Sequence, residues 1–249
     1  MITDPTVYLI AGVAVTCLGL SKGGFIGFGL IATPLLALAI PPLQAAAILL
    51  PVMLAQDMFS AWSFRSDCDR PTLWLVLPGS ILGIALAWLL ARHLDQASVR
   101  LGVGAIGVAF AASHWIGFKL KTQDSVSGVF WGTVAGFTGT LVNAGGPPFL
   151  LYALSKDLPK MTFVGTMAVF FLALNVAKLV PFFALGQFSN RNLATSVVLL
   201  PLAIAANLVA IKLVRRIPAS TFYGISYGLV LLVSTALIWQ GVAQHGGQP

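Results

Sequence analysis

Apolar stretches and short polar segments alternate along the whole chain. Six stretches have spanning length, about 20 residues, and four are shorter and form two pairs, 6–20 with 24–40 and 125–142 with 147–155. No polar stretch is long enough to fold as a separate soluble domain. The pattern predicts one all-α integral membrane domain over residues 1–249. The ten stretches run at about 6–20, 24–40, 43–64, 71–91, 98–118, 125–142, 147–155, 160–184, 193–213 and 219–240.

Composition agrees with this class. The chain is 58% hydrophobic and only 8% charged, whereas soluble domains carry about a quarter charged residues. The net charge of +7 comes from basic residues in short loops, which favours membrane topology over a nucleic-acid partner. Cys17 and Cys68 lack metal-ligand spacing, so we expect neither a metal site nor a cofactor. The start, "MITDP", has no basic residue, so we do not expect a cleaved signal peptide.

The two short pairs are interrupted by unusual segments. The first contains "SKGG" at 21–24 and the second "NAGGPP" at 143–148. Backbone at membrane depth must satisfy its hydrogen bonds, so such interruptions occur inside protein or beside a water-filled cavity. Each pair is therefore either a re-entrant hairpin or a spanning helix followed by a tilted one.

The distribution of basic residues among the loops favours ten segments that alternate in direction. About eight to ten segments would then lie in the membrane. The positive-inside rule then places the larger basic set in the cytoplasm and both termini outside. Counting each pair as one span gives eight spans and a weaker bias. The larger set is Lys22, Arg65, Arg70, Lys119, Lys121, Lys156, Lys160, Lys212, Arg215 and Arg216, against Arg92, Arg100 and Arg191.

The two halves of the chain resemble each other. "GLSKGGFIGFGLIATPLLAL" aligns with "GFTGTLVNAGGPPFLLYAL", and "LARHLD" at 90–95 aligns with "LVRRIP" at 213–218. The repeats would cover about 6–118 and 125–240. Each holds a short pair plus three spanning segments, an odd number, so the second should be inverted relative to the first. Two inverted repeats with broken helices are a transporter architecture, in which one part rocks against the other for alternating access.

The first interruption suggests an anion site. Backbone N–H groups at a helix start favour an anion, and Lys22 adds a positive charge beside Gly23 and Gly24. Two alternatives remain: Lys22 reaches the cytoplasmic surface as a topological anchor, and the glycines serve close helix packing.

The second interruption offers matching groups. Asn143 supplies a hydrogen-bonding side chain, Gly145 and Gly146 supply open backbone, and Pro147 suits the first turn of the next helix. If the halves are inverted, the two interruptions enter from opposite faces and close around one small oxyanion.

Asp57 is a candidate for ion coupling. It lies inside the spanning stretch "LPVMLAQDMFSAW", and an intramembrane carboxylate is a functional candidate by default. Burial disfavours its charged form, so proton uptake and release is one role. The alternative is a structural hydrogen bond or an ion pair with a cation such as Lys178.

The equivalent segment of the second half carries Asn175 and Lys178. Asn175 aligns with Asp57 at an offset of 118 residues, and Lys178 follows one turn later, so both share a helix face. This face is a candidate for lining the cavity, with Asn175 beside the coupling residue and Lys178 holding an anion. Alternatively, Lys178 pairs with Asp57 or reaches the outer interface. No phosphate-binding loop is present, so active transport would use protons, another coupling ion or a partner.

Two motif blocks resemble the sulfite exporter TauE/SafE family, over about residues 12–240. They are "SKGGFIGFGLIATPLLAL" through "PLQAAAILLPVMLAQDMFSAWSFR", and "GFTGTLVNAGGPP" with "FVGTMAVFFLALNVAKLVPFFALGQ". The resemblance implies a permease of a bacterial-type inner membrane for sulfur-containing anions such as sulfite, thiosulfate or sulfoacetate, in import or export. Alternatives are a permease for another anion such as a carboxylate, a membrane-embedded enzyme and a scaffold.

The resemblance also maps onto residues. It implies binding roles for the glycine-rich block and for the second block. Relatives often have glycines where Ile26 and Phe28 stand, and a histidine where Asn143 stands, so a proton role cannot be transferred to that position. Asp57 is then the better coupling candidate. The two blocks here are Lys22, Gly23, Gly24, Gly27 and Gly29, and Asn143, Gly145, Gly146 and Pro147.

Overall fold

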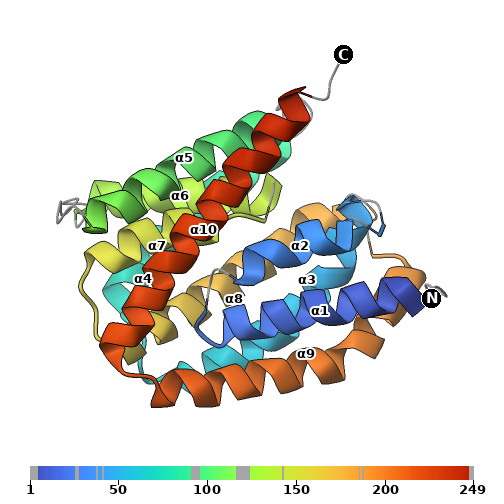
Figure 1. Ribbon diagram of the computed structural model, residues 1–249, viewed down its shortest axis with the longest axis horizontal. Coiled ribbons are helices and arrows are strands. Elements are labelled where there is room, and N and C mark those ends of the chain that lie inside the picture. The colour runs from blue at the N-terminus through green and yellow to red at the C-terminus, as the bar shows by residue number, and fades with distance from the viewer. Residues whose placement is uncertain are drawn as a thin grey trace. The chain divides into compact units, whose positions relative to one another are not determined.

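The computed structural model is all-helical in the residues that it describes (Figure 1). These are 5–25, 28–37, 39–40, 42–90, 96–115, 124–141, 143–184, 186 and 188–246. The prediction of an all-α protein is confirmed, and each predicted stretch corresponds to one helix. The helices are α1 (Pro5–Lys22), α2 (Gly29–Ala37), α3 (Pro42–Phe64), α4 (Arg70–Leu90), α5 (Gln96–Trp115), α6 (Ser125–Leu141), α7 (Gly146–Ser155), α8 (Lys160–Ala184), α9 (Asn190–Arg216) and α10 (Ala219–Gly246).

Among the described residues, six helices are long and apolar enough to cross a membrane. They differ from the predicted six in one respect. The helix α1 has 18 residues because it continues through Ser21 to Lys22, so it is not a short segment. The helix α5 is not among the six, and many of its side chains lie outside the described residues. The candidate spans are Pro5–Lys22, Gln44–Phe64, Arg70–Leu90, Lys160–Ala184, Asn190–Arg216 and Ala219–Ala243.

The helices form two compact units, and neither coincides with a predicted repeat. Unit 1 comprises Met1–Cys68 and Val164–Phe222, and unit 2 comprises Asp69–Phe163 and Tyr223–Pro249. Each unit therefore combines helices from both halves of the sequence. In unit 1, α1 packs against α9, and in unit 2, α6 packs against α4. In the predicted repeats, α1 corresponds to α6 and α4 corresponds to α9, so each packed pair joins a helix of one repeat to a helix of the other. The two packed pairs are therefore equivalent, as an internal repeat would require. The inverted repeat itself stays a prediction.

In unit 1, α1, α3 and α9 run in the same direction. A Cβ at Gly19 would meet Asn207, and one at Gly23 would meet Ala210, so the contacts advance together along α1 and α9. The hydrogen bonds between α3 and α9 advance in the same way: Gln44 donates to Asn192 near the start of both helices, and Asn207 donates to Ser60 further along. The helix α2 begins against Ser21, near the end of α1, and returns alongside it (Figure 1).

In unit 2, α4 and α6 also run in the same direction, because a Cβ at Gly79 would meet Val129 and one at Gly83 would meet Phe137. In contrast, α5 and α10 run in opposite directions: Gly104 lies against Ile238, and Gly241 lies against Leu101. Within each unit, these helix directions are the ones expected if ten successive segments alternate in direction. With eight continuous spans, α3 would run opposite to α1 and α9, and α5 would run parallel to α10. The directions therefore support the count of ten.

Small residues let these helices approach closely. A Cβ at Gly79, Gly83, Gly132 or Gly136 would overlap backbone atoms of the facing helix. Membrane helices gain little from apolar burial against one another, since lipid is equally apolar, and depend on such close packing. The α4–α6 pair is therefore held by glycines on both helices, which agrees with the packing interpretation of glycine in this chain.

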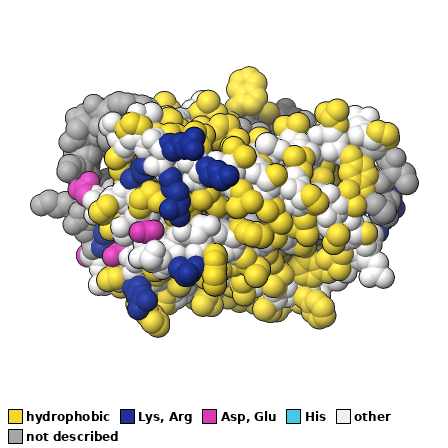
Figure 2. All heavy atoms as spheres, turned by 90° about the horizontal axis from the view of Figure 1, so that it is seen from below, with side chains coloured by type: hydrophobic (Ala, Val, Ile, Leu, Met, Phe, Trp, Pro, Cys, Tyr) yellow, Lys and Arg dark blue, Asp and Glu magenta, His cyan; other side chains and the backbone are white. Residues whose placement is uncertain are grey.

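The exposed surface is suited to lipid. Large hydrophobic side chains such as Trp74, Phe183, Val126 and Trp239 are 76–78% exposed, which a soluble monomer avoids. Figure 2 shows one face with extensive hydrophobic cover and a local group of Lys and Arg side chains. In unit 1, exposed basic residues occur at the ends of the parallel helices α3 and α9. They are Arg65, Lys212, Arg215 and Arg216.

Candidate functional site

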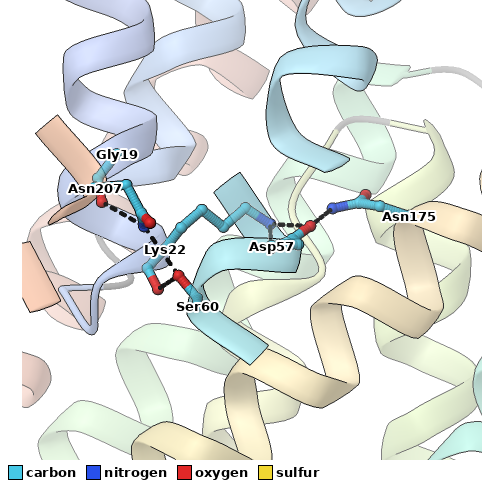
Figure 3. A network of polar contacts seen from close by, with 6 residues as sticks. All are labelled: Gly19, Lys22, Asp57, Ser60, Asn175 and Asn207. Atoms are coloured by element: carbon cyan, nitrogen blue, oxygen red, sulfur yellow. Dashed lines mark hydrogen bonds and ion pairs between the residues drawn. The ribbon is translucent and has the colours of Figure 1, made fainter. Parts of the chain in front are cut away.

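A buried ion pair joins α1 to α3 in unit 1 (Figure 3). The Lys22 Nζ atom lies 2.8 Å from Asp57 Oδ1 and 3.1 Å from Asp57 Oδ2. Asp57 is 0% exposed and Lys22 is 8% exposed. The ammonium is therefore directed to a carboxylate and not to an exposed surface, which removes Lys22 from the loop charges used for topology. The ion pair considered for Asp57 with Lys178 is made here with Lys22.

The helix α8 supplies further contacts to this pair. The Asn175 Nδ2 atom donates to Asp57 Oδ2 over 2.7 Å. The Lys22 ammonium also lies 4.8 Å from the centre of the Phe171 ring, a distance at which a cation is attracted to the ring face. Lys178 is 3% exposed and interacts electrostatically with Lys22 and Asp57. The structure thus brings together four of the predicted site residues: Lys22, Asp57, Asn175 and Lys178.

An uncharged polar network continues from the ion pair to α9. The Ser60 hydroxyl donates to the Lys22 carbonyl oxygen over 2.8 Å, and the Asn207 amide donates to Ser60 Oγ over 2.9 Å and to the Gly19 carbonyl over 3.4 Å. One turn earlier, the Gln56 amide donates to Val15 and Ala203 carbonyls. These side chains connect α1, α3 and α9, and so hold the helices that carry Lys22 and Asp57.

This network is absent from the sequence-based predictions. Ser60 and Asn207 were not predicted from the sequence. Gln56 is a weaker candidate by sequence than Asp57, because adjacent residues of a helix point to different faces. The available signal was the one used for Asp57, a polar residue within an apolar helix: Asn207 interrupts "PLAIAANLVAI". All three side chains are 0% exposed.

We expect Asn207→Ala to lower the free energy of unfolding by about 1–3 kcal/mol, because it leaves buried partners without a hydrogen bond. Unfolding in detergent would measure this loss. Asn190→Ala, at the exposed start of α9, is the control and should change stability little. Equal effects of the two substitutions would show that the network does not stabilise unit 1.

The buried charges do not balance. The charged side chains among the buried described residues are Lys22, Lys178 and Asp57, all in unit 1. With all three ionised, the cluster carries one excess positive charge. Positive charge held away from water is costly, so a cluster in which buried lysines outnumber buried carboxylates favours an anion beside it. We refer to these three residues as the charge cluster.

The N–H groups of Gly23 and Gly24, which were predicted to donate to an anion, are engaged within the protein. Their N–H groups donate to Gly19 and Ser21 carbonyls, over 3.0 and 3.1 Å, because these glycines follow the C-terminus of α1 and not a helix start. Gly23 packs against Ala210, and Gly24 has a φ of 133°, which glycine adopts most readily. Both glycines shape the helix end, while Lys22 carries the charge.

The second interruption lies in unit 2 and differs in form. Asn143 adopts a φ of 53°, which asparagine tolerates better than most residues. Thr138 fixes the turn, since its hydroxyl donates to the Ala144 carbonyl over 3.0 Å. Gly145 then precedes α7, and prolines occupy the first turn as predicted, at Pro147 and the next position. This interruption leads into a helix N-terminus, where an anion is favoured. Gly27 and Ile26 lie outside the described residues.

Comparisons with known proteins place this geometry in context. The family model described as "Sulfite exporter TauE/SafE" matches residues 8–237 of the chain. A search of curated proteins and a search of solved structures returned no match. No group of three or more His, Cys, Asp or Glu residues suited to a metal ion occurs among the described residues. The match covers most of the chain, including both interrupted segments and the charge cluster. The chain therefore belongs to the sulfite exporter TauE/SafE family, a family of membrane transporters and not of enzymes.

Proposed function

We propose that this multi-pass membrane protein is a permease for a sulfur-containing oxyanion, and that the charge cluster binds the transported anion. The observation that carries the proposal is the grouping of two buried lysines with one buried aspartate among α1, α3 and α8. In a low-dielectric interior, a bound anion offsets this charge at a much larger gain than in water. The family assignment gives the class of function, and the cluster suggests where unit 1 meets its substrate.

The groups around the cluster suit an oxyanion. Lysine ammonium groups and the Asn175 amide are donors, and an oxyanion presents several acceptor oxygens. Lys22 and Lys178 supply positive charge from different helices, so an anion held by both would connect α1 to α8. The Phe171 ring restricts the space around the Lys22 ammonium, which favours a small substrate.

The proposal also includes the second interruption, the mode of transport and the orientation in the membrane. Asn143, Gly145, Gly146 and Pro147 form a candidate substrate-binding segment of unit 2, at the start of α7. Transport would proceed by alternating access, in a bacterial-type inner membrane with both termini outside. The basic residues at the ends of α3 and α9 support a cytoplasmic location for those ends.

Thermal unfolding of the purified protein in a panel of anions tests the proposal. A ligand that binds the folded state raises Tm according to its concentration and affinity. We expect a selective rise with one or more of sulfite, thiosulfate, sulfate and sulfoacetate. Acetate and phosphate test the alternative of a carboxylate or general anion permease.

Two matched variants test whether the anion-dependent rise in Tm arises from binding at the charge cluster. Lys178→Gln removes a buried charge, and Lys212→Gln removes an exposed charge from α9. We expect the anion-dependent rise to disappear in the first variant and to remain in the second. If Lys178→Gln retained the full rise, the anion would bind elsewhere. If no anion stabilised the wild-type protein, the proposed function would be contradicted.

A further inference from the structure

We propose that the protonation state of Asp57 selects the charge of the bound anion. A singly charged anion binds while Asp57 is ionised, and a doubly charged anion binds together with one proton, which Asp57 carries. This inference rests on the proposed function, since it requires that the charge cluster binds the substrate.

The net charge of the charge cluster determines which anion makes the site neutral. The two lysines and one aspartate of the cluster leave a single positive charge when all are ionised. One monoanion makes the site neutral without a proton. A dianion would leave one negative charge buried, and burying uncompensated charge is costly. Protonation of Asp57 raises the cluster to two positive charges, which a dianion neutralises.

Asp57 also competes with an oxyanion for hydrogen-bond donors. The Asp57 carboxylate occupies two donors that an oxyanion could use, the Lys22 ammonium and the Asn175 amide. Asp57 Oδ1 receives no hydrogen bond from the described residues and depends on its ion contact with Lys22. A proton on Asp57 ends that ionic contact and releases the Lys22 ammonium. The same event therefore adds the missing charge and frees a donor for the second charge of the ligand.

Two other titratable groups of the described residues face Asp57, and both are buried lysines. The helices α1 and α8 each present one buried charged residue to Asp57, namely Lys22 and Lys178. The helix α9 contributes the uncharged Asn207, and α2 has no charged residue in its sequence. Among the described buried residues of unit 1, Asp57 is the acidic group, which makes it the site for a co-bound proton.

The test compares thiosulfate with methanesulfonate, because the first is a dianion and the second a monoanion throughout the range between about pH 5.5 and about pH 8.5. Thermal stabilisation is measured for the wild type, Asp57→Asn and Asp57→Glu, each relative to its own anion-free Tm. Calorimetry in buffers of different ionisation enthalpy counts the protons taken up when each anion binds the wild type.

We expect the affinity of the wild type for thiosulfate to fall with rising pH, by up to about tenfold per pH unit, as binding coupled to one proton requires. Methanesulfonate binding should change little. Asp57→Asn should bind thiosulfate without this pH dependence, and Asp57→Glu should retain it. Proton uptake should be about one per thiosulfate and near zero per methanesulfonate.

Two results would overturn the inference and leave the proposed function intact: the same pH dependence for both anions, or thiosulfate binding without proton uptake. If neither these anions nor sulfite bound to any form of the protein, the proposed function itself would fail, and the inference with it.

Discussion

Lys22→Met should destabilise the protein by about 3–5 kcal/mol, because it removes the ammonium that directly contacts both oxygens of the buried Asp57 carboxylate. Methionine retains most of the lysine's length, so packing changes little while the charge is lost. Asn175 would still donate to Asp57, but one neutral amide does not replace an ammonium 2.8 Å away. Unfolding by denaturant or heat in detergent would measure the loss.

The double variant Lys22→Met/Asp57→Asn separates the loss of the direct ion contact from the loss of packing. Replacing a whole buried ion pair by neutral groups costs far less than removing one partner, and the amide carbonyl introduced by Asp57→Asn can still accept from Asn175. We therefore expect the double variant to recover most of the stability. Lys212→Met, at an exposed position, should change stability by about 0.5 kcal/mol or less. A double variant no more stable than Lys22→Met would contradict the ion-pair account.

Gly83→Ala should destabilise unit 2 by about 1–3 kcal/mol, because overpacking in a close contact forces the backbone to shift. A Cβ at Gly83 would overlap the Thr133 carbonyl oxygen and meet the Phe137 backbone. No flexible side chain can move aside there, so α4 and α6 would have to separate. Tm in detergent, with yield of folded protein, would measure the effect.

Gly102 in α5 provides the matched control. No atom of the described residues lies within 4 Å of a Cβ added at Gly102. Alanine also favours a helix by up to about 1 kcal/mol over glycine. Gly102→Ala should therefore be neutral or slightly stabilising. If Gly83→Ala behaved like Gly102→Ala, close α4–α6 packing would not contribute to stability.

Much of the helical organisation could be predicted from hydrophobic pattern. Every helix corresponds to an apolar stretch, because membrane-spanning helices need long apolar runs bounded by polar loops. Asp57 and Asn175 were paired by repeat alignment, and the structure joins them by a hydrogen bond. Both predictions depend on local or periodic features, which a sequence displays directly.

The partners within the site could not be predicted in the same way. Whether Lys22 reaches a surface, binds a ligand or pairs with Asp57 depends on how α1 lies against α3, and side-chain pattern does not specify this. The same limit explains Gly23 and Gly24. Glycine marks both a helix start that offers N–H groups and a helix end that uses them, and only the backbone hydrogen bonds distinguish the two.

The most direct test of the anion-binding charge cluster is uptake of radiolabelled sulfite, thiosulfate and sulfate into proteoliposomes. The comparison uses the wild type, folded Lys178→Gln and Lys212→Gln. We predict transport of at least one of these anions by the wild type and by Lys212→Gln, and loss of that transport in Lys178→Gln. Wild-type rates in Lys178→Gln, or no transport by the wild type, would contradict the account.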